Sequence, residues 1–221
     1  DQELLAVRAL EKKIQENGYR LSTGFVGSGI LTETLAEHGL NNLAYSLLLQ
    51  RENPSWLYSV DQGATTIWER WNSYTLATGF GDVGMNSFNH YAYGAVQEWM
   101  YRHVAGIEVD ENAPGFARVI LQPKPDTRTD AEMPAGQERI KWVRCHFDSP
   151  HGRIVSNWST ENGFVYEAET PVPATLYLPV LTEGDTVEIN GVSHKLDEYR
   201  KCPHGNVLTL TLTPGKYTFK M

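Results

Sequence analysis

The spacing of the apolar residues changes near residue 105, and this change constrains the fold more than any other feature of the chain. Before it, apolar residues recur at steps of three and four. In "QELLAVRALEKKIQENG", residues 2–18, four of them would share one face of a helix: Leu4, Val7, Leu10 and Ile14. After it the period is two, which is typical of β-strands. We therefore expect a helical portion, residues 1–105, followed by an all-β domain, residues 106–221.

The first portion should contain about five helices. After the segment 2–18, which Gly18 should end, we expect helices over residues 27–39, 40–53, 54–63 and 86–106. Pro54 suits the first turn of the fourth helix. Asn86 or Ser87 could cap the fifth. This last helix is apolar on more than half of its circumference, so it should be buried between neighbours.

The second portion consists of short β-rich runs separated by Gly, Pro, Asn and Asp. These runs are "FARVILQP", "RIKWVRCHF", "GRIVSNWST", "GFVYEAET", "ATLYLPV", "TVEIN", "NVLTLTLT" and "KYTFKM". A spacing of roughly 8–12 residues between such runs predicts an antiparallel β-sandwich.

Composition excludes several classes of protein. The chain has 221 residues, 41% of them hydrophobic, which is enough for a real core, and a net charge of -8, which argues against binding to nucleic acid. No run approaches the length of about eighteen apolar residues that crosses a bilayer, so no membrane partner is expected. Cys145 and Cys202 lie far apart and outside any metal-ligand spacing, so we expect two reduced thiols, with a disulfide between them as the alternative, and no metal and no cofactor.

The stretch "GATTIWERWNS", residues 63–73, places Glu69 between Trp68 and Trp71. Thr65 or Thr66 could cap a helical turn there. Indole faces pack on the C–H faces of a pyranose, and loss of hydration beside them raises the pKa of a carboxylate, which suits proton transfer near neutral pH. The alternative is an ordinary ion pair of Glu69 with Arg70, or with another base, that stabilises a turn.

A second polar cluster is "GMNSFNHYAYG", residues 84–94. If Asn86 or Ser87 begins a helix, His90 lies in its first turn, beside Asn89 and Tyr93, where a sugar hydroxyl could bind. The alternative is a structural histidine. The glycine-rich "STGFVGSG", residues 22–29, matches no phosphate-binding pattern and is interpreted as a tight turn.

The two clusters occur in the order of a known family. Residues 20–125, with "GATTIWERW" followed by "NSFNHYAYG", closely resemble the C-terminal part of bacterial family 78 α-L-rhamnosidases, and the resemblance continues more loosely through residues 149–159. It implies the C-terminal portion of an (α/α)6 barrel followed by a β-sandwich. It also implies a bacterial protein of the cytoplasm or periplasm, whose substrates are rhamnose-containing glycosides or oligosaccharides.

The resemblance also implies roles for residues. The family hydrolyses terminal α-L-rhamnosyl groups with inversion, which requires a general acid and a general base roughly 6.5–9.5 Å apart. The glutamate of "TTIWERW", here Glu69, is the base, and the histidine of "NSFNHY", here His90, binds the sugar. Trp68 and Trp71 are candidates for the apolar wall of the sugar subsite.

The general acid of the family belongs to an acidic motif upstream in the barrel, for which this chain has no counterpart. Three early glutamates lack that motif and should lie on a helix surface: Glu3, Glu11 and Glu16. We therefore expect a portion of a rhamnosidase that holds the base, lacks the acid and is inactive alone. Its unfinished barrel should expose an apolar face and favour self-association.

Other interpretations remain open. The chain could belong to a different (α/α)6-barrel glycosidase. The β domain could be a carbohydrate-binding module with a stacking platform at Trp142, Trp158 or Tyr177, although aromatic residues on strands are usually core. It could also be purely structural.

Overall fold

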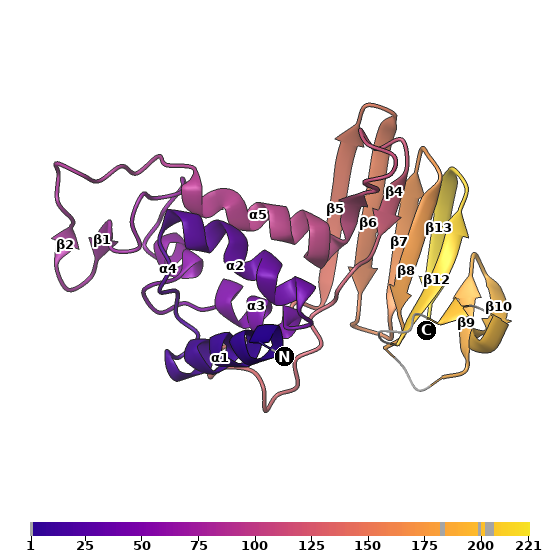
Figure 1. The fold of residues 1–221 in the computed structure, drawn as a ribbon, viewed down its shortest axis with the longest axis horizontal. Helices are drawn as coiled ribbons and strands as arrows, with labels where there is room; N and C mark the ends of the chain where they lie inside the picture. The colour runs from indigo at the N-terminus through magenta and orange to yellow at the C-terminus, as the bar shows by residue number, and fades with distance from the viewer. Residues whose placement is uncertain (1, 182–183, 199, 202–205) are drawn as a thin grey trace. The chain divides into compact units, whose positions relative to one another are not determined.

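A computed structural model describes residues 2–181, 184–198, 200–201 and 206–221. The chain divides into two compact units. The helical unit comprises Asp1–Trp99 and Asp126–Arg139, and the β unit comprises Met100–Pro125 and Ile140–Met221. Helices followed by antiparallel sheets confirm the expected fold class (Figure 1).

The helical unit begins with four α-helices. They are α1 (Gln2–Glu16), α2 (Phe25–Glu37), α3 (Asn41–Leu48) and α4 (Trp56–Asp61). Gly18 and Gly39 follow α1 and α2 with φ of +66° and +79°, a conformation that favours glycine, so both helices end as the sequence predicts. Among the described residues, no helix is long and apolar enough to cross a membrane.

The start of α4 differs from the prediction. Ser55 is its N-cap, with an extended backbone (φ −162°) and a hydroxyl that accepts a hydrogen bond of 3.1 Å from the N–H of Tyr58. Because serine supplies the cap, Pro54 lies before the helix and not in its first turn. The short hairpin of β1 (Tyr74–Thr75) and β2 (Gly79–Phe80) follows α4 in the chain.

The last helix also begins later than expected. It consists of a 3₁₀ turn, η1 (Ala92–Ala95), then α5 (Val96–Trp99) and a π-helical stretch, η2 (Met100–Ala105). The prediction that Asn86 or Ser87 caps this helix is wrong, as is the placement of His90 in its first turn. The reason is that the backbone groups of Ser87 and His90 bond to residues 69 and 67 and not within a helical turn.

An irregular segment, residues 126–139, returns to the helical unit after the first two strands of the β unit. Its anchor is the buried ion pair of Arg128 and Asp126, with two N···O distances of 2.9 and 2.8 Å. Arg128 also donates to Ser46 on α3, and Gln137 donates to the Ser46 carbonyl at 2.9 Å. These bonds fix the segment to α3.

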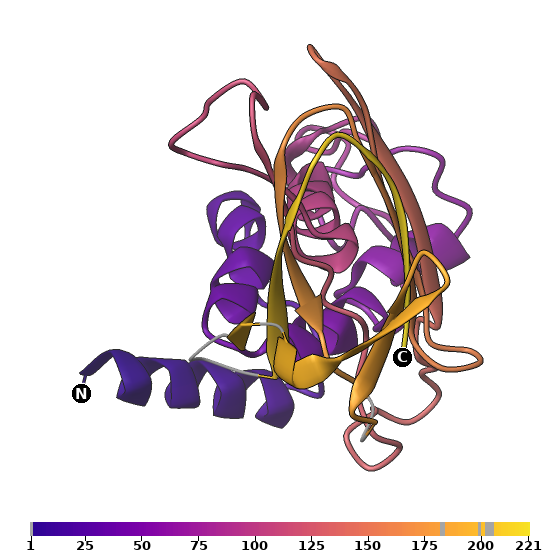
Figure 2. The same cartoon turned by 90° about the vertical axis from the view of Figure 1, so that its right-hand side faces the viewer.

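The β unit contains two sheets. Its strands are β3 (Ile107–Val109), β4 (Val119–Leu121), β5 (Trp142–Ser149), β6 (Gly152–Ser159), β7 (Val165–Thr170), β8 (Ala174–Pro179), β9 (Thr186–Ile189), β10 (Val192–Lys195), β11 (Arg200–Lys201), β12 (Val207–Leu212) and β13 (Gly215–Lys220). The described strands are ordered β10-β9-β13-β7-β6-β5 and β11-β12-β8-β4-β3. All pairs are antiparallel except β4 with β8, and Figure 2 shows the two layers of strands.

Alternating residues of the strands form the core of the β unit, as a period of two predicts. On β6 the inward residues Ile154, Ser156 and Trp158 are buried. The Trp158 indole N–H donates to the Val104 carbonyl at 2.7 Å, so this ring is part of the core. Burial raises the pKa of the Cys145 thiol, which is free, whereas Cys202 lies outside the described residues.

Candidate active site

The two polar clusters singled out in the sequence are joined through their backbones. The N–H of Glu69 donates to the Ser87 carbonyl at 2.9 Å, and the N–H of His90 donates to the Ile67 carbonyl at 2.8 Å. Two such bonds in opposite directions hold the segments 67–69 and 87–90 side by side. Glu69 and His90 therefore lie on neighbouring stretches of backbone, although they are 21 positions apart in the sequence.

The Glu69 side chain is half-buried and held in place. Its Oε2 accepts a hydrogen bond of 2.6 Å from the N–H of Ser87. A backbone donor at this distance fixes the orientation of the carboxylate. The bond comes to one carboxylate oxygen, so the second oxygen has the capacity to accept a proton from water.

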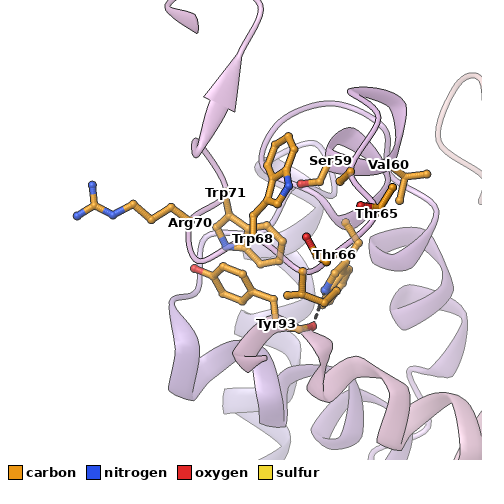
Figure 3. Close-up of a pocket in the computed structure, with 11 residues that line it drawn as sticks. Ser59, Val60, Thr65, Thr66, Trp68, Arg70, Trp71 and Tyr93 are labelled. Carbon is orange, nitrogen blue, oxygen red and sulfur yellow. Dashed lines mark hydrogen bonds between the residues drawn. The ribbon is translucent and has the colours of Figure 1, made fainter. Parts of the chain in front are cut away.

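The alternative role for Glu69, an ion pair with Arg70 at a helix start, does not match the structure. Residues 65–72 form a loop without helix. None of the ion pairs within the described part of the chain contains Glu69, and Figure 3 shows the Arg70 side chain pointing away from Trp68 and Trp71. The predicted cap at Thr65 or Thr66 is also wrong, because the Thr66 hydroxyl donates to the Phe88 carbonyl instead of accepting a backbone N–H.

His90 stands between two aromatic rings. Its imidazole stacks on Phe25 with ring centroids 4.7 Å apart and an interplanar angle of 19°, and on Tyr91 at 5.5 Å and 5°. The N–H of Ala92 approaches Nδ1 at 3.4 Å. A neutral imidazole whose Nδ1 accepts carries its proton on Nε2, so His90 can present an N–H donor to a ligand hydroxyl.

Trp68 and Trp71 are packed side chains that border one cavity. Trp68 is buried and meets Phe88 edge-to-face at 5.3 Å. Trp71 stacks on Tyr93 at 3.7 Å, and its indole N–H donates to the Thr23 carbonyl at 2.9 Å. Burial raises the pKa of the Tyr93 phenol.

The cavity has a volume of about 270 Å³, and four of its eleven lining residues are aromatic (Figure 3). Its lining includes Trp56, Trp68, Trp71 and Tyr93, but Glu69 is not among the lining residues. In the structure the two tryptophans line one cavity. Glu69 and His90 lie on two backbone segments that are hydrogen-bonded to each other. The roles of all four residues stay predictions.

Sequence reasoning missed three contributors to this arrangement. Phe25, which stacks on His90, lies in the glycine-rich stretch that was interpreted only as a turn. Ser87 was a candidate cap, yet its backbone N–H and carbonyl both bond to Glu69. Trp56 donates its indole N–H to the Tyr93 carbonyl at 2.8 Å. A bulky aromatic residue inside the glycine-rich turn was the one available signal.

The early glutamates lie at other places in the helical unit. Glu3 hydrogen-bonds to His38 at 3.1 Å, and Glu16 pairs with Lys12 at 3.6 Å. Glu11 lines a different cavity, of about 490 Å³, together with Arg128 and Glu132. Within the described ranges, no group of three or more His, Cys, Asp or Glu side chains could hold a metal ion.

Comparison with protein families gives matches over most of the chain. Residues 1–104 match the bacterial alpha-L-rhamnosidase six-hairpin glycosidase domain, and residues 106–193 match the bacterial alpha-L-rhamnosidase C-terminal domain. An alpha-L-rhamnosidase of Formosa agariphila is 36% identical over 225 residues, which cover 97% of this chain and 22% of that protein. One of Streptomyces avermitilis is 40% identical over 163 residues, covering 73% of this chain and 15% of that protein.

Solved structures give the same result. The crystal structure of Streptomyces avermitilis alpha-L-rhamnosidase complexed with L-rhamnose has a TM-score of 0.82 and 32% identity, covering 98% of this chain and 19% of that one. The structure of the enzyme from Dictyoglumus thermophilum has a TM-score of 0.79 and 30% identity, covering 96% and 22%. The chain thus spans about a fifth of the length of these relatives.

Proposed function

Because this chain belongs to the bacterial α-L-rhamnosidase family, as the C-terminal part of its six-hairpin domain and its C-terminal domain, we propose that it contributes the general base to an inverting α-L-rhamnosidase site. The substrates are glycosides or oligosaccharides with terminal α-L-rhamnosyl groups. The observation that carries the proposal is the bond from Ser87 to Glu69, which holds a carboxylate beside the segment that bears His90.

The proposed base acts on water. The Glu69 carboxylate takes a proton from a water molecule as that water attacks the anomeric carbon, on the face opposite the leaving group. The hydrogen bond from the Ser87 N–H keeps one oxygen of the carboxylate in place before the reaction. The Nε2–H of His90 donates a hydrogen bond to a sugar hydroxyl. The stacked ring of Phe25 holds the imidazole in that orientation.

The general acid is supplied by residues outside 1–221. Two observations support this part of the proposal. The chain spans about a fifth of its relatives, and Glu3 and Glu16 are engaged by His38 and Lys12. Without the second carboxyl group the glycosidic oxygen leaves unprotonated, so the 221-residue chain alone should not turn over a rhamnoside.

We also propose that the chain self-associates when it is produced alone. Large apolar side chains between residues 76 and 91 are exposed, among them Phe80 at 72% and Val83 at 96%. Isolated proteins rarely leave such surfaces in water. Analytical ultracentrifugation at several concentrations should show a concentration-dependent increase in mass, and a monodisperse monomer would contradict this.

The test of the function compares two proteins with one substrate panel. The full-length gene product that contains residues 1–221 should release p-nitrophenol from p-nitrophenyl α-L-rhamnoside. The isolated 221-residue chain should not. Proton NMR of the first product should show β-L-rhamnose, the inverted anomer. Preference for another aryl glycoside would instead support a different (α/α)6-barrel glycosidase, and a retained anomer would overturn the role of Glu69 as base.

A further inference from the structure

A shallow depression of about 260 Å³ lies on one sheet of the β unit, over β5, β6 and β7. The side chains that line it include Trp142, Arg144, Asn157, Ser159, Glu161 and Glu167. The strand register places five of them in two rows: Arg144, Asn157 and Glu167 are direct neighbours across the three strands, and Trp142 pairs with Ser159. Residues two apart on a strand share a face, so both rows lie on the same side of the sheet.

That side is the one turned away from the core. The intervening residues Trp158 and Tyr166 point inward and are buried, Trp158 with 2% of its surface exposed. Trp142, in contrast, is 56% exposed. Of the three aromatic residues that the sequence offers as a stacking platform, Trp158 is core and Tyr177 is half-buried on β8. Trp142 alone among the three presents a largely open ring.

The platform and its polar neighbours are held in place by contacts within the sheet. The Arg144 guanidinium carbon lies 5.7 Å from the centroid of the Trp142 ring, a cation–π contact that orients a surface indole. The Asn157 side-chain oxygen accepts from the N–H of Cys145 at 3.0 Å, and its amide donates to Glu167 at 3.5 Å. The ring and the amide are therefore ordered before a ligand arrives.

The charges of the depression select the class of ligand. The guanidinium of Arg144 provides donors, and the carboxylates of Glu161 and Glu167 provide acceptors. An anionic ligand would meet two carboxylates, and a cationic ligand would meet the guanidinium. The hydroxyl groups of a neutral polyol can accept hydrogen bonds from the guanidinium and donate hydrogen bonds to the carboxylates. The C–H faces of its ring can pack on an indole.

From these observations we propose that the β unit carries a binding site for a neutral saccharide, with Trp142 as the stacking platform and Arg144, Asn157 and Glu167 as the polar contacts. The site uses no residue of the helical unit. The test of this proposal is therefore independent of the test of Glu69 as the general base. The ligand of the site is a pyranose ring, in free form or within a glycan.

The test is fluorine NMR of the full 221-residue chain labelled with fluorotryptophan. The chain has six tryptophans, and the Trp142 resonance is assigned by its loss in Trp142→Phe. The probes are L-rhamnose, D-galactose and cellobiose, with D-galacturonate as the charged counterpart of galactose. We expect at least one neutral sugar to shift the Trp142 resonance to saturation, and galacturonate to bind more weakly than galactose.

Variants separate this site from the rest of the chain. Trp142→Ala, followed by calorimetry, should weaken binding by about tenfold, because the stacking contact is lost. Lys216→Ala, on β13 outside the depression, should leave the titration of the Trp142 resonance unchanged. The proposal is overturned if no neutral sugar moves the Trp142 resonance, or if Trp142→Ala binds as tightly as the parent chain.

Discussion

The backbone N–H of Ser87 donates to the Glu69 carboxylate over 2.6 Å, while the Ser87 carbonyl accepts from the Glu69 N–H at 2.9 Å. One residue thus holds both the backbone and the side chain of the proposed base. The orientation of Glu69 depends on main-chain atoms of the segment that carries His90. Displacement of either segment would therefore disturb the carboxylate and the histidine together.

Glu69→Gln should lower the kcat of the encoded polypeptide by about 10²–10⁴, because the amide keeps the shape of the side chain but cannot take a proton from water. Steady-state hydrolysis of an aryl α-L-rhamnoside measures this. Added azide, which needs no general base, should restore turnover and give the β-azide. Glu37→Gln, at an exposed position on α2, is the matched control. A Glu69→Gln enzyme within a few fold of the parent would show that the base lies elsewhere.

Phe25→Ala should raise KM about 3- to 10-fold with a smaller effect on kcat, because Phe25 acts on the sugar through the stacked ring of His90. A double-mutant cycle with His90→Ala checks this. If Phe25 works by positioning His90, the loss caused by Phe25→Ala should disappear once the imidazole is gone. Additive losses would mean that Phe25 contributes to the enzyme in some other way.

The sequence predicts those elements in which a regular spacing of apolar residues decides the structure. The three- and four-residue spacing of Leu4, Val7, Leu10 and Ile14 predicts α1, and a period of two predicts the strands of the β unit. It fails where long-range bonds replace local ones. Residues 86–91 contain good caps and apolar spacing, yet their backbone bonds to residues 67 and 69 and forms no helix.

The candidate site shows the same division. The order of the two clusters in the sequence predicts that Glu69 and His90 belong to one site; the structure places them on paired backbone segments, and their roles stay predictions. It does not indicate that Trp68 and Trp71 line a cavity whose lining lacks Glu69, because that depends on the packing of Tyr93 and Trp56 against Trp71. Nor does any local pattern show that residues 126–139 return to α3, since this depends on the long-range contacts of Arg128 with Ser46.

Arg128→Met should destabilise the helical unit by about 3–5 kcal/mol, because it leaves the buried carboxylate of Asp126 without its guanidinium. Urea unfolding of the 221-residue chain measures the loss. The double variant Asp126→Leu with Arg128→Met should recover part of it, since no uncompensated charge remains. Arg139→Met breaks an exposed ion pair with Asp130 and should cost no more than about 1 kcal/mol. Equal losses in Arg128→Met and Arg139→Met would contradict a buried anchor.

The stability of both units should fall in alkaline solution. Burial raises the pKa of the Tyr166 phenol in the β unit and of the Tyr45 phenol in the helical unit, in each case well above the ordinary value of about 10. Above that pH the unfolded chain loses these protons while the folded chain keeps them. Because the unfolded state then binds fewer protons, the free energy of unfolding decreases as the pH rises. Below about pH 10 this contribution is fully present.

Tyr166→Phe separates this effect from general alkaline damage. The variant loses the 3.0 Å hydrogen bond to Ser156, which should cost about 1 kcal/mol at neutral pH. It also removes one titrating phenol, so the unfolding free energy of the β unit should fall less steeply above pH ~10, by up to about 1.4 kcal/mol per pH unit. Urea unfolding at a series of alkaline pH values measures both changes, with Tyr91→Phe as the control for loss of one exposed phenol. An unchanged slope in Tyr166→Phe would mean that the folded state releases the Tyr166 proton as readily as the unfolded chain does.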